Sequence, residues 1–360
     1  MKIIDCHMHV FPFLGSECGW ESQEAHLDYL GKHLYGGARP ESAKASFWTS
    51  KLDINFRVGQ FGRMEWTEKG AVYYRQFMPP SLQEQVATPD FIVSQMDHAG
   101  IDMAVLQNCK LYGKLNEYFA ESIQKYPDRF VGTAEINEFE ADKEKEISKL
   151  RYGVKELGFK GLFYGATDFP KIGQPTAFND KKFDLFWREV SDLGIAVLWN
   201  FTSSKLYMDQ MRAFASWKDR FPEISSLVSM GFCVRPFIEN GKVKYPKELF
   251  NIFKKPNVLA ELAYPIQAGP VGWDYPFPEA NEWIKRQYEE LGAQKLCWGS
   301  DMPNVERNCT YRQCLTHLTK YCDFIASKDM ELILGGNIAR IMKIRTDIPR
   351  TPGLKLADVA

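Results

Sequence analysis

Short apolar segments alternate with amphipathic segments from Thr88 to Asp301, and this alternation restricts the possible folds more than any other feature of the chain. The apolar segments have the length of buried strands, and the amphipathic segments have the length of helices. Strands that alternate with helices favour a parallel sheet covered by those helices. The expected strands, in chain order, are 2–11, 103–107, 130–136, 159–164, 195–200, 225–229, 258–261 and 296–301.

Helix signals occupy the intervening segments. Thr88-Pro89-Asp90 predicts a helix start with Thr88 as the cap, and Gly100 predicts its end. About eight strands in this arrangement are typical of a closed barrel, so the expected fold class is an α/β (β/α)8 TIM barrel. A doubly wound open sheet alternates in the same way, but no Gly-x-Gly-x-x-Gly turn follows the first strand. The remaining expected helices are 140–157, 181–193, 205–219, 244–253 and 279–291.

The segment 12–88 interrupts the alternation and is rich in aromatic residues. It follows the first strand, so it leaves a barrel at the C-terminal face, where barrels place their active sites. We expect a lid or pocket wall, although the rings could equally pack the insertion against the barrel or a second subunit. The predicted organisation is one barrel domain, 1–344, with a C-terminal extension, 345–360. The insertion 12–88 and the extension 345–360 both favour a homodimer.

Composition excludes several classes of partner. A net charge of -1 and the lack of a Lys/Arg cluster argue against nucleic acid. No segment approaches the roughly 20 apolar residues of a membrane span, and the chain enters its first strand without a signal-peptide pattern. The 8 cysteines contain no Cys-x-x-Cys pair, which favours reduced thiols. We therefore expect a cytoplasmic protein that acts on a small molecule, without a membrane partner.

The first strand carries polar residues at alternate positions, in Asp5-Cys6-His7-Met8-His9. Strict strand alternation places Asp5, His7 and His9 on one face. Two imidazoles on neighbouring positions of one face can hold a cation, and a nearby carboxylate can orient them. The alternative is that the histidines are hydrogen-bonded core residues.

Two later motifs accompany this strand: Cys297-Trp298-Gly299-Ser300-Asp301-Met302-Pro303 and Gly336-Asn337-Ile338-Ala339-Arg340. Together the three motifs resemble the amidohydrolase superfamily, in the amidohydrolase 2 branch that includes the aminocarboxymuconate-semialdehyde decarboxylase group. The resemblance covers most of the chain and is poorest over 12–88. It implies a (β/α)8 barrel with Asp-x-His-x-His on strand one, a histidine ending strands five and six, and an Asp ending strand eight.

The resemblance implies that His7, His9 and Asp301 meet around one divalent metal ion. Two imidazoles and a carboxylate suit zinc, our first expectation, and also manganese or ferrous iron. Asp301 would be both a metal ligand and the base or proton shuttle for water. Alternatively, Asp301 caps the turn that follows, because Gly-Ser-Asp-x-Pro is also good turn chemistry. Asp5 would orient a ligand histidine or the strand end.

The chain departs from the family pattern at two histidine positions, where alignment places Asn200 on strand five and Ser229 on strand six. The Asn200 carbonyl could ligate a metal, although more weakly than imidazole. The missing strand-six histidine leaves proton transfer to another group. Glu261, at the end of strand seven, is the best substitute, with a salt-bridged rim residue as the alternative.

Further residues are candidates for contact with substrate. Tyr164 and Trp199 could wall a cyclic or aromatic ring, although strand alternation could equally turn Trp199 toward the helices. Arg235 could bind a carboxylate with two hydrogen bonds, whereas a structural ion pair is the commoner use of a single arginine. Ser229 completes the expected substrate-binding set.

These expectations combine into a metal-dependent hydrolase. The resemblance implies a small cyclic or aromatic substrate with a carboxylate or carbonyl group, attacked by metal-activated water. The main competing reaction is non-oxidative decarboxylation, with Asp301 or Glu261 delivering a proton to the ring carbon. The sequence is also compatible with a hydratase, a metal-free hydrolase or a ligand-binding barrel with a degenerate metal site.

Overall fold

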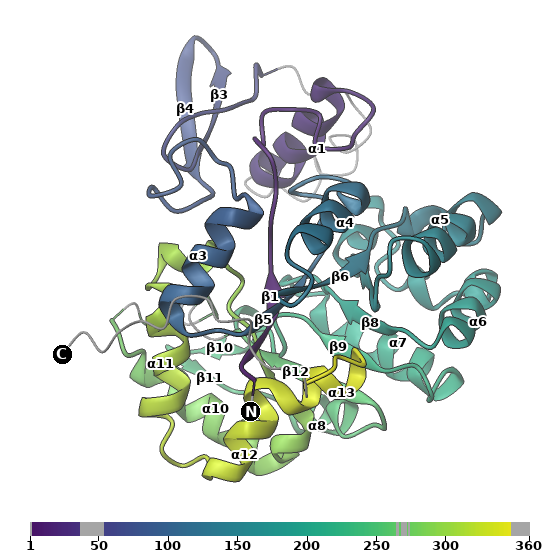
Figure 1. The fold of residues 1–360 in the computed structure, drawn as a ribbon, viewed down its shortest axis with the longest axis vertical. Coiled ribbons are helices and arrows are strands. Elements are labelled where there is room, and N and C mark those ends of the chain that lie inside the picture. Colours follow the sequence, from purple (N-terminus) through teal and green to yellow (C-terminus); the bar gives the residue numbers. More distant parts are fainter. Residues whose placement is uncertain (1, 37–53, 264–265, 268–271, 273, 347–360) are drawn as a thin grey trace.

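The computed structural model describes residues 2–36, 54–263, 266–267, 272 and 274–346 (Figure 1). Its central feature is an 8-stranded parallel sheet. Every expected strand forms, most of them shortened at the ends by one to a few residues, whereas the strand expected at 258–261 ends one residue later. In sheet order the strands are β1 (Ile4–Met8), β5 (Met103–Leu106), β6 (Phe130–Ala134), β7 (Gly161–Tyr164), β8 (Ala196–Trp199), β9 (Ser226–Val228), β12 (Val258–Leu262) and β13 (Leu296–Trp298).

Backbone hydrogen bonds join the last strand of this sheet to the first. Asp301 N donates to His7 O over 3.0 Å, and His9 N donates to Met302 O over 2.9 Å. These bonds close the sheet into the expected barrel. They also place the polar residues of β1 beside Ser300 and Asp301, which follow β13.

Helices connect the strands and surround the barrel in Figure 1. The predicted cap is present, because Thr88 Oγ1 accepts a hydrogen bond from Phe91 N and Gly100 adopts a φ of 81°. The helices are α3 (Pro89–Ala99), α4 (Asn116–Lys125), α5 (Glu144–Lys155), α6 (Asp184–Leu193), α7 (Tyr207–Arg220), α8 (Lys247–Phe253), α10 (Pro278–Leu291), α11 (Tyr311–Tyr321), α12 (Ser327–Glu331) and α13 (Asn337–Ile341). Shorter helical turns are η1 (Glu138–Glu140), η2 (Ala166–Ile172), η3 (Ala177–Asn179), η4 (Lys181–Phe183), η5 (Arg235–Phe237), η6 (Ala293–Lys295), η7 (Asn304–Arg307) and η8 (Leu332–Gly336).

Two hydrophobic layers stabilise the barrel. Leu198 of β8 belongs to a small cluster inside the sheet, together with Ile338 of α13 and Met342, which follows that helix. The neighbouring Trp199 belongs to the larger outer cluster between sheet and helices. This alternation along β8 is the one expected for a strand whose two faces are both buried.

The register of β1 against β5 shifts between Asp5 and Met8. As a result Asp5 contacts Tyr311 of α11, with Tyr311 Oη donating to Asp5 Oδ2 over 2.7 Å. His7 instead contacts Glu261 on β12. The expectation that Asp5, His7 and His9 share one face is therefore wrong for Asp5, because an irregular strand does not keep the strict period of two.

The insertion forms helix α1 and a small antiparallel sheet at one end of the barrel (Figure 1). Its elements are α1 (Gln23–Gly36), β2 (Arg57–Val58), β3 (Arg63–Glu68) and β4 (Ala71–Gln76). A second small ribbon after β9 pairs β10 (Ile238–Glu239) with β11 (Lys242–Val243). Of the C-terminal extension, residues 347–360 lie outside the described part of the chain.

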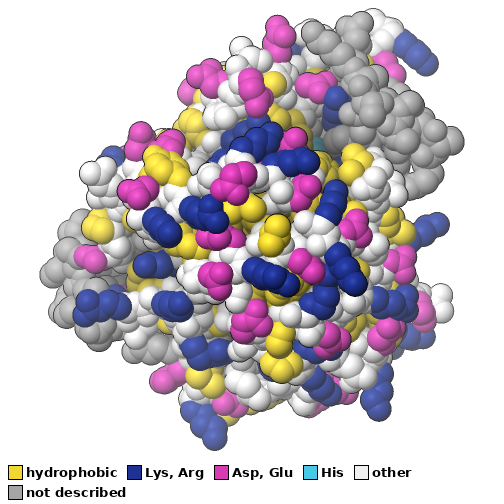
Figure 2. Space-filling view, turned by 90° about the vertical axis from the view of Figure 1, so that its right-hand side faces the viewer, with side chains coloured by type: hydrophobic (Ala, Val, Ile, Leu, Met, Phe, Trp, Pro, Cys, Tyr) yellow, Lys and Arg dark blue, Asp and Glu magenta, His cyan; other side chains and the backbone are white. Residues whose placement is uncertain are grey.

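The surface mixes charges of both signs on the face shown in Figure 2, where Lys and Arg side chains alternate with Asp and Glu. None of the helices that the structure describes combines the length and the apolar character needed to cross a bilayer. All 8 cysteines are free thiols, as their spacing predicted.

Candidate metal centre

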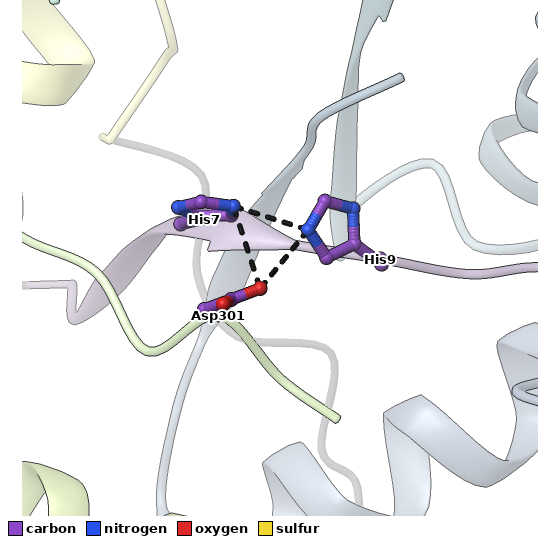
Figure 3. Close-up of side chains that lie close together, drawn as sticks. All are labelled: His7, His9 and Asp301. Atoms are coloured by element: carbon purple, nitrogen blue, oxygen red, sulfur yellow. Dashed lines mark hydrogen bonds and ion pairs between the residues drawn. The ribbon is translucent and has the colours of Figure 1, made fainter. Parts of the chain in front are cut away.

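Three side chains from the two ends of the barrel sequence converge at the closure between β1 and β13. His7 Nε2 lies 3.0 Å from His9 Nε2, and Asp301 Oδ1 lies 3.1 Å from His9 Nε2 and 3.5 Å from His7 Nε2 (Figure 3). All three residues are buried. The structure therefore brings together the His7, His9 and Asp301 that the sequence singled out.

The outer nitrogen of each imidazole is fixed by a partner that accepts a hydrogen bond. His9 Nδ1 donates to Gln107 O over 2.9 Å, and His7 Nδ1 donates to Glu261 Oε1 and Oε2 over 2.9 and 3.0 Å. With the proton on Nδ1, each neutral ring presents the lone pair of Nε2 to the other. Two lone pairs that face each other repel, so the geometry favours a cation between them, either a proton or a metal ion.

The electrostatics of the trio also favour positive charge. Burial lowers the pKa of His7, but the carboxylates of Glu261, Asp301 and Asp5 raise it to about 9. Burial, followed by the neighbouring His7, lowers the pKa of His9. Burial opposes ionisation of Asp301, but His7 and His9 hold its pKa below the usual value. The centre thus contains an ionised carboxylate beside two imidazoles.

These donors fit a divalent transition-metal ion. Ligands of one tetrahedral ion with bonds of about 2.0–2.1 Å lie roughly 3.3 Å from one another. The observed separations of 3.0, 3.1 and 3.5 Å bracket that value. Two imidazoles and one carboxylate suit zinc, manganese or ferrous iron, and they leave coordination positions for water and substrate.

Asp5 fixes the backbone at the closure rather than contacting the side chains of the trio. Its Oδ1 accepts hydrogen bonds from His7 N and Ser300 N, each 2.9 Å long. Its Oδ2 accepts from Ser300 Oγ and from Tyr311 Oη. Burial raises the pKa of Asp5 to about 6, against the lowering effect of these hydrogen bonds. Asp5 therefore ties β1 to the residue that precedes Asp301.

Glu261 lies behind His7 and is only 1% exposed. One face of its carboxylate meets His7 Nδ1, and Oε2 also accepts a hydrogen bond from Met230 N over 2.9 Å. Both oxygens are therefore occupied within the protein. This placement fits a residue that orients a metal-ligand histidine, as second-sphere carboxylates commonly do.

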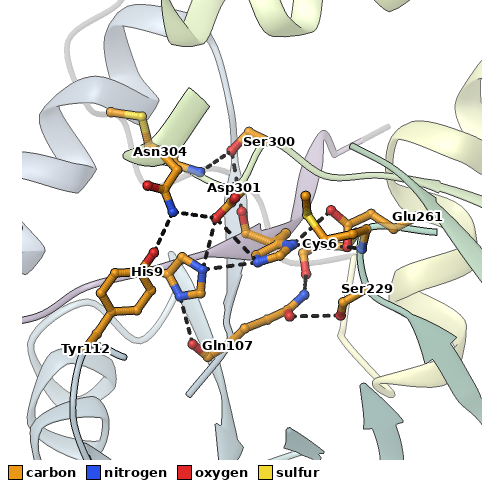
Figure 4. Close-up of polar contacts among 12 residues, drawn as sticks. Cys6, His9, Gln107, Tyr112, Ser229, Glu261, Ser300, Asp301 and Asn304 are labelled. Carbon is orange, nitrogen blue, oxygen red and sulfur yellow. Dashed lines mark hydrogen bonds and ion pairs between the residues drawn. The ribbon is translucent and has the colours of Figure 1, made fainter. Parts of the chain in front are cut away.

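Ser229 and Asn200, at the two departures from the family pattern, line one cavity of about 360 Å³. Ser229 Oγ donates to Gln107 Oε1 over 2.9 Å, and Gln107 Nε2 donates to Cys6 O over 2.8 Å (Figure 4). Among the described residues, no hydrogen bond joins the Asn200 side chain to the metal-centre trio. Arg235 lines the same cavity.

Tyr164 and Trp199 occupy a different environment from the one expected for a substrate wall. Both are fully buried, and neither lines the cavity that contains Asn200. The Tyr164 ring lies 4.9 Å from Trp187, and the Trp199 ring lies 4.7 Å from Trp217. They belong to the aromatic layer between the sheet and the helices, so strand alternation turns them away from the barrel interior.

Sequence reasoning missed several neighbours of the trio. Tyr112 packs 4.4 Å from the His9 ring, and Asn304 Nδ2 donates to Asp301 Oδ1 over 3.2 Å (Figure 4). Gln107 could have been found as a polar residue at the C-terminal end of an apolar strand, and Asn304 as the residue three positions after Asp301. Tyr112 and the cavity-lining Arg75 carry no local signal.

Comparison with known proteins identifies the family of this chain. The Amidohydrolase model of the amidohydrolase 2 family matches residues 4–344. Comparison with curated proteins gives no match. Among solved structures, an amidohydrolase from Burkholderia multivorans has a TM-score of 0.62 and 11% identity, covering 96% of this chain and 100% of that chain.

Two further solved structures are similar in fold. A probable 2-pyrone-4,6-dicarboxylic acid hydrolase from Acinetobacter baumannii has a TM-score of 0.57 and 17% identity, covering 95% of this chain and 100% of that chain. The manganese-bound 5-carboxyvanillate decarboxylase of Novosphingobium aromaticivorans has a TM-score of 0.55 and 14% identity, covering 95% and 97%. With a family model that spans nearly the whole described barrel, the chain belongs to the amidohydrolase 2 family.

Proposed function

We propose that this protein is a metal-dependent hydrolase that opens or cleaves a small cyclic or aromatic substrate bearing a carboxylate or carbonyl group. The observation that carries the proposal is the convergence of His7 Nε2, His9 Nε2 and Asp301 Oδ1 within 3.5 Å of one another. Zinc is the proposed metal, with manganese and ferrous iron as the ions that the same donors also accept.

A divalent ion held by His7, His9 and Asp301 would supply Lewis acidity and would lower the pKa of bound water to about 7. The two oxygens of Asp301 have different surroundings and can therefore have different roles. Oδ1 faces the two imidazoles, whereas no described residue donates a hydrogen bond to Oδ2. Asp301 can therefore take a proton from the attacking water through Oδ2 and return it to the leaving group. Such transfer typically contributes 10²- to 10⁴-fold to a rate.

Glu261 and Gln107 act as positioning residues in this proposal. Each fixes the Nδ1 proton of one histidine, so each Nε2 keeps its lone pair for the metal. Glu261 was expected to replace the missing strand-six histidine in proton transfer. Its occupied oxygens favour the positioning role, which leaves proton transfer to Asp301.

Decarboxylation is the second candidate, and the single proton-carrying side chain favours it. Release of CO2 from an aromatic acid requires one proton at the ring carbon, and the ionised Asp301 could relay that proton from a bound water or from a hydroxyl group of the substrate. One structural neighbour is named as a decarboxylase and another as a hydrolase. The shared substrate chemistry is a small ring that carries carboxylate groups.

The first test is metal content, measured by elemental analysis of the wild type and of the variants His7→Ala and Asp301→Ala. The control is His98→Ala, which removes an exposed histidine of α3. We expect about one equivalent of metal in the wild type and in the control, and loss of metal in the two site variants. A wild type that contains no metal and takes up none after dialysis against zinc or manganese would contradict the proposal.

Turnover then separates the two reactions. Metal-loaded protein is incubated with aromatic lactones and with hydroxybenzoic acids, and ring opening and CO2 release are measured in parallel. Ring opening without CO2 supports the hydrolase. CO2 release alone assigns the decarboxylase in its place.

A further inference from the structure

Asp301, one of the three residues of the metal centre, has a backbone conformation that is rare for a residue with a side chain. Its φ is 59°, in the left-handed region, where the Cβ atom of any residue other than glycine crowds the backbone. This conformation is unfavourable and persists only where surrounding contacts impose it. The contacts that impose it therefore also determine where the buried carboxylate of Asp301 lies.

Hydrogen bonds of Ser300 fix the backbone on both sides of Asp301 (Figure 4). Before Asp301, Ser300 N donates to Asp5 Oδ1 over 2.9 Å, and Ser300 Oγ donates to Asp5 Oδ2. After Asp301, Met302 N donates to Ser300 Oγ over 3.0 Å. The left-handed turn at Asp301 thus depends on where Asp5 and Ser300 lie.

Asp5 is completely buried and accepts four hydrogen bonds from described residues, two on each oxygen. Three of them come from His7 N and from Ser300, which the closure of the barrel brings beside Asp5. The fourth comes from Tyr311 Oη, which donates to Oδ2 over 2.7 Å from the first residue of α11. Tyr311 therefore links the closure of the barrel to a helix outside it.

Tyr311 is itself held in one position. It is 2% exposed, and its ring stacks on Trp298 of β13 with the ring centroids 6.3 Å apart. A capping box fixes the start of α11, since Thr310 Oγ1 accepts from Gln313 N and Gln313 Oε1 accepts from Thr310 N. Among the described contacts, none joins Tyr311 to the side chains of the metal-centre trio. Any effect of Tyr311 on the trio must therefore pass through Asp5.

We propose that Tyr311 is a positioning residue of the metal centre, which acts through Asp5 and Ser300 to hold the carboxylate of Asp301 against the two imidazoles. This inference rests on the proposed function, because it assigns the trio to a metal ion. Without the Tyr311 hydroxyl, Asp5 Oδ2 keeps one donor among the described residues, and a buried carboxylate that lacks a donor is unfavourable. Asp5 then shifts, Ser300 Oγ turns toward His7 O, 3.4 Å from it, and the turn at Asp301 relaxes.

The metal affinity of Tyr311→Phe, which removes the hydroxyl and keeps the ring, tests the proposal. The matched control is Tyr245→Phe, whose similarly buried hydroxyl donates to Phe232 O over 3.3 Å. Chelator competition with zinc and cobalt(II) should show about 10-fold weaker binding in Tyr311→Phe, at the lower end of the range for groups that orient metal ligands, and no change in the control. The visible absorption spectrum of the cobalt(II) protein, which depends on coordination geometry, should change in Tyr311→Phe alone.

Urea unfolding of the metal-free proteins distinguishes positioning from stability. Tyr311→Phe and Tyr245→Phe each lose one buried hydrogen bond, so both should lose stability. Ser300→Ala interrupts the same path, and its combination with Tyr311→Phe should lose less metal affinity than the sum of the single losses. If Tyr311→Phe loses stability but keeps the affinity and the cobalt spectrum of the wild type, Tyr311 has a structural role only and the proposal is wrong.

Crystal structures of the metal-free wild type and of Tyr311→Phe keep the positioning role apart from the proposed function. We expect Asp301 Oδ1 of the variant to lie farther from His9 Nε2 than the 3.1 Å of the wild type. If the wild type binds no metal but this shift is present, the positioning role stands and the proposed function fails. If the wild type binds metal but Asp301 stays in place and the affinity of the variant is unchanged, the proposed function stands and the positioning role is wrong.

Discussion

His7 Nδ1 lies 2.9 Å from Glu261 Oε1, which joins the first strand of the barrel to the seventh across 254 positions of sequence. Both side chains are almost completely buried. A buried imidazole paired with a carboxylate is held in one tautomer and one orientation. The pairing therefore determines which nitrogen His7 presents to a metal.

Replacement of this carboxylate tests its positioning role. Glu261→Gln keeps the shape of the side chain but removes its charge and one acceptor, so metal affinity should fall about 10- to 100-fold. Chelator competition measures that affinity, and Glu248→Gln, at an exposed pair with Arg212, is the control. An unchanged affinity in Glu261→Gln would show that His7 is oriented without the carboxylate.

Gly299 provides an independent way to disturb the same carboxylate. A Cβ at this position would lie 2.6 Å from Glu261 Oε1 and 2.9 Å from Cys6 Sγ, so Gly299→Ala should displace Glu261. We expect weaker metal binding, as in Glu261→Gln. Because both changes act through one contact, the double variant should lose less affinity than the sum of the single losses. Additive losses would place the effect of Gly299→Ala elsewhere.

Substitution of Tyr164 distinguishes a role of this residue in packing from a role in substrate binding. Its hydroxyl is buried without a hydrogen-bond partner in the described structure, and burying an unpaired hydroxyl costs about 1–3 kcal/mol. Tyr164→Phe should therefore leave the free energy of unfolding unchanged or raise it, and should leave KM unchanged. Urea unfolding and steady-state kinetics measure the two quantities. A large increase in KM would return Tyr164 to the substrate wall.

We expect the protein to lose stability in mild acid because of the buried His317. It is buried on α11, its Nε2 donates to Asn281 Oδ1 over 2.8 Å, and burial lowers its pKa to about 4. Because the unfolded state binds a proton at a pKa of about 6.5, stability from neutral His317 is present above that pH and is lost as the pH falls. Between pH 7 and pH 5 this residue should remove about 2 kcal/mol from the free energy of unfolding.

Urea unfolding of His317→Gln at the two pH values isolates this contribution. The glutamine keeps a donor for Asn281 but does not titrate, so the variant should lose about 2 kcal/mol less than the wild type between pH 7 and pH 5. Equal losses in the two proteins would assign the acid sensitivity to other groups.

The strands and most helices could be predicted because their signals are local. The cap at Thr88 and the stop at Gly100 depend on residues within one turn of the helix end, and the structure has both. Strand ends differed by a few residues, since hydrogen bonding across the sheet decides where a ladder stops. The insertion could be located by its interruption of the pattern, but its own sheet was not predicted.

The functional residues also differ in whether a local sequence signal identifies them. His7, His9 and Asp301 could be proposed from motif and spacing, whereas Arg75 and Tyr112 are brought near the site by folding alone. Asp5 was assigned to the wrong face because the register shift in β1 leaves no mark in a short apolar strand. The outward orientation of Tyr164 and Trp199 likewise follows from barrel register.

By itself the sequence determined the alternation of strands and helices and the two imidazoles and one carboxylate that can hold a metal, because both depend on residue type and short spacing. The tertiary structure decided that Glu261 fixes His7, that Tyr164 packs outside the sheet, and that Arg75 joins Arg235 in one cavity. Those relationships depend on barrel closure, strand register and the position of the insertion, which are set by contacts between residues far apart in the chain.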